Sequence, residues 1–151
     1  MLKARDIMTR KVITVNESLP VRKLAKVLAE NRISGAPVVN DQGTVVGVVT
    51  ESDLIDQTKK IHIPTVVAIF DAFLYLENPE HLEKELKKMA ASTAGDIGTR
   101  KFASVTEETP LDEVATIMAE ENVHTLPVLD DGRLVGVIGK SDIIWTLAQS
   151  Q

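Results

Sequence analysis

The sequence carries one pattern twice, and this internal repeat constrains the fold more than any other feature. Residues 47–55 read GVVTESDLI, and residues 136–144 read GVIGKSDII. Upstream, residues 6–38 match residues 96–128 at a constant offset of 90 positions, which falls to 89 after a one-residue deletion in a turn. A surface turn tolerates such a deletion well. Two copies of about 50 residues therefore predict one structural unit that is used twice.

The first copy predicts the element order strand, helix, strand, strand, helix. Residues 12–15 are predicted as a short strand, and the helix after them has one apolar face at helical spacing. That face consists of Val21, Leu24, Ala25 and Leu28. We expect this helix to end near residues 31–32. A hairpin of strands 33–39 and 45–49 should follow, with a second helix from about Thr50.

The second copy predicts the same order. Val105 marks its short strand, and residues 126–129 and 134–138 form its hairpin. The helix between the short strand and the hairpin carries Leu111, Val114, Ala115 and Met118. The last helix holds Ile143, Ile144 and Leu147. We therefore expect a mixed α/β fold of the α+β type, built from two β-α-β-β-α repeats.

The stretch between the copies repeats nothing and is predicted to be a helical insertion. Its first helix would place four apolar side chains on one side. These are Val66, Ile69, Phe70 and Phe73. The predicted division is a first repeat over residues 1–58, an insertion over 59–93 and a second repeat over 94–151.

The composition excludes several classes of function. A net charge of −5 argues against a nucleic-acid partner, because phosphate binding relies on clustered Lys and Arg. The absence of cysteine excludes disulfides, thiolate catalysis and cysteine-based zinc sites. The N-terminus lacks the apolar core of a signal peptide, and the most apolar window, residues 63–76, is too short to span a bilayer. We expect a cytoplasmic protein with no membrane partner.

Three segments in each copy resemble a known family. In the first copy they are residues 6–9, 33–39 and 47–53. In the second copy they are residues 96–97, 123–129 and 136–142. Each copy resembles a cystathionine-β-synthase-type (CBS) domain, and the tandem pair resembles a Bateman module. The resemblance implies two repeats that associate by their sheets around a pseudo-twofold axis and leave two clefts between them.

The family resemblance implies a non-catalytic sensor of adenosine-containing ligands such as AMP, ADP or ATP, and sometimes S-adenosylmethionine. The aspartate of the Gly-x-x-Thr-x-x-Asp motif would accept hydrogen bonds from the ribose hydroxyls. The start of each copy would face the motif of the other copy. The implied binding residues are Thr9, Val12, Arg32, Thr50, Asp53, Thr99, Arg100, Lys101, Phe102, Gly139, Ser141 and Asp142.

The second copy departs from this pattern at two positions. Gly139 stands where the first copy has Thr50, so one hydroxyl is missing and Ser141 is the available substitute. This difference predicts that the cleft of Asp53 binds its ligand more tightly. The basic residue that often holds phosphates in the family corresponds to Arg32, and Asn122 does not fit that role.

Simpler interpretations exist for several of these residues. Thr50 and Asp53 also fit a helix capping box, and capping can coexist with binding. The basic pairs at 10–11 and 100–101 fit either phosphate contact or surface solubility. His124 is predicted to be a partly exposed loop histidine, and no pairing of histidines with acids predicts a metal site.

No catalytic motif was found. The sequence lacks the phosphate-binding loop of nucleotide hydrolases, the zinc-binding HExxH and the serine elbow GxSxG, so we expect no enzyme and no required cofactor. Two hypotheses remain. One is a nucleotide sensor that passes ligand occupancy to a partner protein, whose identity the sequence leaves open. The other is a dimerisation scaffold that has lost its ligand. A homodimer is predicted from the apolar face of the insertion, which could instead cap its own module.

Overall fold

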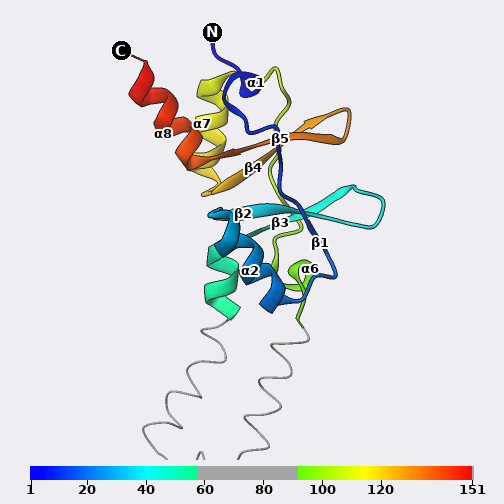
Figure 1. The fold of residues 1–151 in the computed structure, drawn as a ribbon. Helices are drawn as coiled ribbons and strands as arrows, with labels where there is room; N and C mark the ends of the chain where they lie inside the picture. Colours follow the sequence, from blue (N-terminus) through cyan, green and yellow to red (C-terminus); the bar gives the residue numbers. More distant parts are fainter. Residues whose placement is uncertain (58–91, 151) are drawn as a thin grey trace, which may run out of the picture.

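The computed structural model describes residues 1–57 and 92–150, which fold into two similar halves (Figure 1). Within these residues the predicted α+β class and the repeated order of strands and helices are confirmed. The predicted apolar face of the insertion, from residue 66 to residue 73, lies outside the described residues. The two hairpins face each other at the centre, and helices cover the other sides (Figure 1).

The first half contains a three-stranded sheet. β1 (Val15–Asn16) pairs in parallel with β2 (Gly35–Val39), and β2 pairs antiparallel with β3 (Val45–Thr50). α2 (Val21–Asn31) connects β1 to β2, and a helical segment over residues 51–57 follows β3. The parallel pair requires such a crossover connection, and α2 supplies it.

The second half repeats this arrangement. β4 (Thr125–Asp130) pairs antiparallel with β5 (Arg133–Gly139). α7 (Leu111–Glu120) precedes β4, and α8 (Lys140–Gln149) follows β5. Val105 makes a single parallel bridge to β4, at the place that β1 occupies in the first half.

Each copy begins with a one-turn helix that the sequence did not predict. These are α1 (Ala4–Ile7) and α6 (Ala94–Ile97). We name residues 1–13 and 92–103 the leading segments, and each of them crosses to the half that the other copy forms. α1 contacts β5 and α8, whereas α6 contacts β1 and β3 (Figure 1).

The exchange of leading segments reaches into both cores. Ala4 is fully buried in the core of the second half, and Ala94 is fully buried in the core of the first. The backbone N–H of Val21, at the start of α2, donates to the carbonyl of Ser92 at 3.0 Å, and the equivalent bond in the other half has the same length. Each half is therefore completed by the other copy.

The cores are aliphatic, as predicted, with two corrections. Ala25 was predicted on the buried face of α2 but is exposed. The sheet covers only the side of the helix that carries Leu24, and Ala25 lies outside this side. Of the predicted strand 12–15, only Val15 pairs with β2. Residues 12–14 run from one half to the other and pair with no strand (Figure 1).

The helices α2 and α7 end in matching left-handed residues. Arg32 and Asn122 each have a φ of 53°. Asn adopts this conformation several times more often than most residues, whereas a long side chain such as Arg is disfavoured there.

The final helix leaves its apolar side chains exposed. Ile144, Trp145 and Leu147 of α8 are 65%, 67% and 60% exposed. Ile55, at the equivalent position of the first copy, is 65% exposed. Nothing in the described part of the chain covers these four side chains.

Candidate functional site

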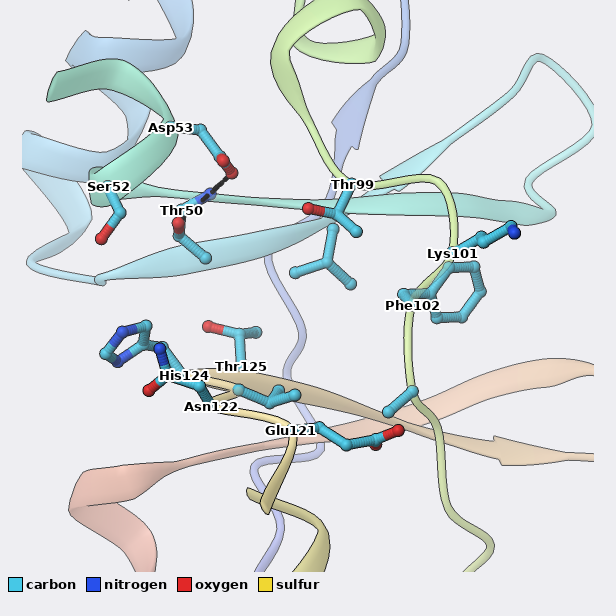
Figure 2. A pocket seen from close by; sticks show the side chains of 13 residues that line it. Thr50, Ser52, Asp53, Thr99, Lys101, Phe102, Glu121, Asn122, His124 and Thr125 are labelled. Carbon is cyan, nitrogen blue, oxygen red and sulfur yellow. Dashed lines mark hydrogen bonds between the residues drawn. The ribbon is translucent and has the colours of Figure 1, made fainter. Parts of the chain in front are cut away.

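The first cleft is a cavity of about 430 Å³ between the two halves. The end of β3, the second leading segment and the α7–β4 connection line it (Figure 2). Its polar, charged and aromatic members are Thr50, Ser52, Asp53, Thr99, Lys101, Phe102, Glu121, Asn122, His124 and Thr125. Val48, Ala103 and Val123 add apolar surface. The volume lies in the range of small-molecule sites.

The second cleft is a cavity of about 470 Å³, built from the equivalent elements of the other copy. The β5–α8 junction, the first leading segment and the α2–β2 connection line it. Its polar and charged members are Thr9, Lys11, Arg32, Ser34, Glu51, Thr125, Ser141 and Asp142. Gly35 and Gly139 expose backbone, and the apolar surface comes from Ile13, Ile33, Pro37 and Val137.

Backbone hydrogen bonds place each leading segment beside the strand that ends in the aspartate motif. The N–H of Val48 donates to the carbonyl of Thr99 at 3.0 Å, and the N–H of Thr99 donates back to Val48 at 2.8 Å. Thr9 and Val137 make the same exchange, at 2.8 and 3.0 Å. Gly47 permits this approach, because a Cβ atom there would lie 2.9 Å from the carbonyl oxygen of Thr99.

The two aspartates cap the helices that they begin. The N–H of Thr50 donates to Oδ2 of Asp53 at 2.8 Å, and the Thr50 hydroxyl donates to the same oxygen at 3.3 Å (Figure 2). In the second copy the N–H of Gly139 donates to Oδ2 of Asp142 at 2.8 Å. The glycine therefore removes a hydroxyl but keeps the main-chain half of the cap.

Each capping carboxylate keeps one oxygen for a ligand. Both caps use Oδ2, and within residues 1–57 and 92–150 no hydrogen bond or ion pair reaches Oδ1 of Asp53 or Asp142. Both side chains are half-buried and line a cleft. An ionised carboxylate offers about four acceptor positions on its two oxygens. Capping and ligand binding are therefore compatible at both positions.

Thr125 lines both clefts and is only 5% exposed. Gly35 lies against it, and a Cβ atom at Gly35 would overlap the Thr125 hydroxyl oxygen and lie 3.0 Å from the carbonyl oxygen of Val49. One buried side chain thus forms part of the wall between the two cavities.

A comparison with models of protein families identifies the family. The model of the CBS domain matches residues 4–60 and 94–149. This chain belongs to the CBS domain family. The two matches, one for each repeat, make it a tandem CBS pair, or Bateman module, and the resemblance inferred from the sequence is confirmed.

The CBS pair has relatives of known sequence and structure. It is 30% identical over 152 residues to the uncharacterized protein MJ1426 of Methanocaldococcus jannaschii, and the match covers 95% of this chain and 89% of that protein. It is similar to the crystal structure of CBSX2 of Arabidopsis thaliana in complex with AMP, with a TM-score of 0.73 and 26% identity over 99% of this chain and 98% of that chain.

A third similarity involves a different ligand. The CBS domain pair of protein MJ0100, in complex with 5′-methylthioadenosine and S-adenosyl-L-methionine, matches with a TM-score of 0.70 and 25% identity over 96% of this chain and 98% of that chain. The chain spans only 60% of the full length of CBSX2. Some further matches are enzymes of which a CBS pair is a minor part.

The structure brings most of the predicted site residues of the CBS pair together. Thr50, Asp53, Thr99, Lys101 and Phe102 line the first cleft. Thr9, Arg32, Gly139, Ser141 and Asp142 line the second cleft. Val12 lines neither cleft. Arg100 also lines neither, because its side chain lies beside Gly95, in a small pocket against α6. The predicted role of these residues in ligand binding stays a prediction.

The predicted set omitted several residues that line the clefts. Glu121, Asn122 and His124 reach the first cleft from the α7–β4 connection, and His124 is half-buried there. Lys11 and Ser34 reach the second. The offset of 90 positions was the available signal, because Lys11 is the equivalent of Lys101 and Asn122 is the equivalent of Arg32.

The described residues offer no metal site and no membrane span. No group of three or more His, Asp or Glu side chains in residues 1–57 and 92–150 could hold a metal ion. No helix in the same part of the chain is long and apolar enough to cross a bilayer. The cytoplasmic location and the lack of a nucleic-acid partner stay predictions.

Proposed function

We propose that this CBS pair is a non-catalytic regulatory module that binds adenosine-containing ligands in its two clefts. The observation that carries the proposal is the unused Oδ1 atom of Asp53 and of Asp142, each on a half-buried carboxylate in a cavity of nucleotide size. Ribose presents two adjacent hydroxyl groups, and hydrogen bonds to an ionised acceptor are shorter and stronger than neutral ones.

The remaining lining residues fit the other parts of such a ligand. In the first cleft Val48, Phe102, Ala103 and Val123 offer apolar surface to an adenine ring. In the second cleft Ile13, Ile33, Pro37 and Val137 offer the equivalent surface. The ligands in the CBSX2 and MJ0100 structures share the adenosine group and support this class. AMP, ADP and ATP are the expected ligands, with S-adenosylmethionine as a further member of the class.

The test compares three aspartates that make the same capping contact. Asp53→Asn and Asp142→Asn keep an oxygen for the cap but remove the charge from a cleft. Asp96→Asn is the matched control, because Oδ2 of Asp96 accepts from the N–H of Thr93 at 3.0 Å in α6, outside both clefts. The readout is isothermal titration calorimetry with AMP, ATP and S-adenosylmethionine.

We expect each cleft variant to weaken one binding event by about tenfold, the difference between a charged and a neutral hydrogen-bond acceptor. The Asp96 variant should bind like the wild type. If no adenosine compound binds the wild-type protein at millimolar concentration, the module is not an adenosine sensor. If all three variants bind equally well, the carboxylates act only as helix caps.

A second candidate function, a dimerisation scaffold, is favoured by the exposed apolar side chains of α8. Ile144 and Trp145, together with Ile55 of the first copy, would be covered in a homodimer that pairs through these helices. We therefore also propose a homodimer. Light scattering should give about twice the chain mass of 16.5 kDa, and Trp145→Lys should halve it. Gln149→Lys on the same helix is the control, since Gln149 is exposed and polar. A wild-type mass near 16.5 kDa would refute the dimer.

A further inference from the structure

We propose that the two clefts take adenosine ligands of different charge. The second cleft, with Asp142, takes a ligand with a polyphosphate chain. The first cleft, with Asp53, takes a neutral or cationic adenosine compound, such as a nucleoside, thioether or sulfonium. This inference rests on the proposed function and adds the ligand class of each site.

The decisive difference lies at one pair of equivalent positions. Arg32 follows α2 and lines the second cleft, and Asn122 follows α7 and lines the first. Both residues have a φ of 53°, so the backbone is left-handed at both positions. The same place in the two clefts therefore holds a guanidinium group in one and a neutral amide in the other.

The neighbouring residue increases the difference. Glu121 lines the first cleft beside Asn122. Its equivalent, Asn31, does not line the second cleft, because the side-chain amide of Asn31 donates to the carbonyl of Val27 at 2.8 Å, one turn back along α2. A carboxylate thus faces the first cleft where the second has no charge.

The full sets of charged residues have different balances. In the second cleft two cations, Lys11 and Arg32, stand with two carboxylates, Glu51 and Asp142. In the first cleft one cation, Lys101, stands with Asp53 and Glu121, while His124 is counted as neutral. If the aspartate of each cleft binds ribose, a polyphosphate meets two cations and one acid in the second cleft. In the first cleft the same polyphosphate would lie near one cation, Lys101, and one carboxylate, Glu121.

Arg32 is available for an anion in the free protein. Its side chain is exposed, and no ion pair or hydrogen bond of its guanidinium occurs within residues 1–57 and 92–150. Its left-handed backbone is unfavourable for an arginine, and such strain is typical of functional positions. A guanidinium group matches phosphate oxygens with paired N–H donors and stays charged at every physiological pH.

The inference changes the order of affinity that Thr50 and Gly139 alone predict. The missing hydroxyl at Gly139 weakens the ribose end of the second cleft, whereas Arg32 strengthens its phosphate end. A charged hydrogen bond contributes more than a neutral one. For a ligand with two or three phosphates the second cleft should therefore have the higher affinity. The first cleft should have the higher affinity only for ligands without phosphates.

The experiment exchanges the charges between the clefts and measures ATP and S-adenosylmethionine binding by calorimetry. Arg32→Asn gives the second cleft the residue of the first. The double variant Glu121→Gln, Asn122→Arg gives the first cleft the character of the second. Asp53→Asn and Asp142→Asn, each made in the wild type and in both exchange variants, identify which cleft produces each binding event. Arg22→Asn is the matched control, because Arg22 is an exposed arginine of α2 outside both clefts.

We expect wild-type ATP binding to depend on Asp142 and S-adenosylmethionine binding to depend on Asp53. Arg32→Asn should weaken ATP binding by about tenfold and leave S-adenosylmethionine binding unchanged. The double variant should gain a second ATP site that Asp53→Asn removes. Thermal melting in the absence of ligand confirms that each variant is folded.

Two results separate the inference from the function on which it rests. If ATP binds to the cleft of Asp53, or if Arg32→Asn leaves ATP affinity unchanged, the assignment of charge classes is wrong while the adenosine sensor stands. If neither ATP nor S-adenosylmethionine binds, the proposed function fails and the inference fails with it.

Discussion

Arg32 should make the free protein less stable than it would be with a residue suited to its backbone. Arg32→Asn introduces the residue that the second copy already has at the equivalent position and at the same φ of 53°. A left-handed conformation costs an ordinary L-residue about 1–2 kcal/mol, and Asn is among the residues that tolerate it best. The guanidinium has no partner in the described part of the chain, so its removal loses no contact there.

We therefore expect Arg32→Asn to raise the free energy of unfolding by about 0.5–1 kcal/mol. For a chain of this size the melting temperature should rise by about 1–4 °C. The reciprocal variant, Asn122→Arg, should lower it by a similar amount. Differential scanning calorimetry in the absence of nucleotide measures both changes.

The control separates a backbone effect from the loss of a positive charge. Lys26→Asn removes a positive charge from the middle of α2, where Asn is a poorer helix former than Lys, so this variant should melt at a lower temperature. The reasoning is refuted if Arg32→Asn lowers the melting temperature or if Asn122→Arg raises it. Either result would mean that the arginine side chain stabilises the free fold.

Two further predictions concern other contacts between the two copies. Gly35→Ala should destabilise the protein by about 1–3 kcal/mol, because the new methyl overlaps the Thr125 hydroxyl. In a double-mutant cycle measured by chemical unfolding, Thr125→Ala should restore part of this loss. Additive losses in the double variant would contradict the contact. The hydrogen bond from Lys3, with the charge of Arg5, holds the pKa of Glu108 below its ordinary value of 4.5. These contacts therefore contribute to stability above pH 4.5, and their contribution is lost as the pH falls through the lowered pKa. An NMR titration of Glu108 should show the lowered pKa, and Lys3→Met should raise it. A wild-type pKa of Glu108 at or above 4.5 would contradict the predicted effect of Lys3.

Local patterns in the sequence predicted the elements of both repeats well. The spacing of Val21, Leu24 and Leu28 predicted α2, and the alternation around the two turns predicted both hairpins, because these signals depend on neighbours in the chain. The exposure of Ala25 and the shortness of β1 depend on which surfaces meet in three dimensions. No periodicity records that information.

The clefts were predicted less completely for the same reason. The aspartate motifs and the facing leading segments followed from the family resemblance. Glu121 and His124 reach the first cleft only because the α7–β4 connection folds against the other half. Arg100 was placed in the site because the family resemblance implied the whole range 99–102, yet its side chain packs beside α6 instead.

The crossing of the leading segments has a consequence for folding and for the origin of the chain. Ala4 completes the core of the second half and Ala94 completes the core of the first, so neither copy contains all of its own contacts. A single repeat could satisfy them only by exchanging its leading segment with a second molecule. The duplicated chain is thus equivalent to a segment-swapped dimer joined into one polypeptide. Its halves must fold together, through contacts such as Val48 with Thr99 and Thr9 with Val137, whose partners lie far apart in the sequence, and such distant contacts slow folding.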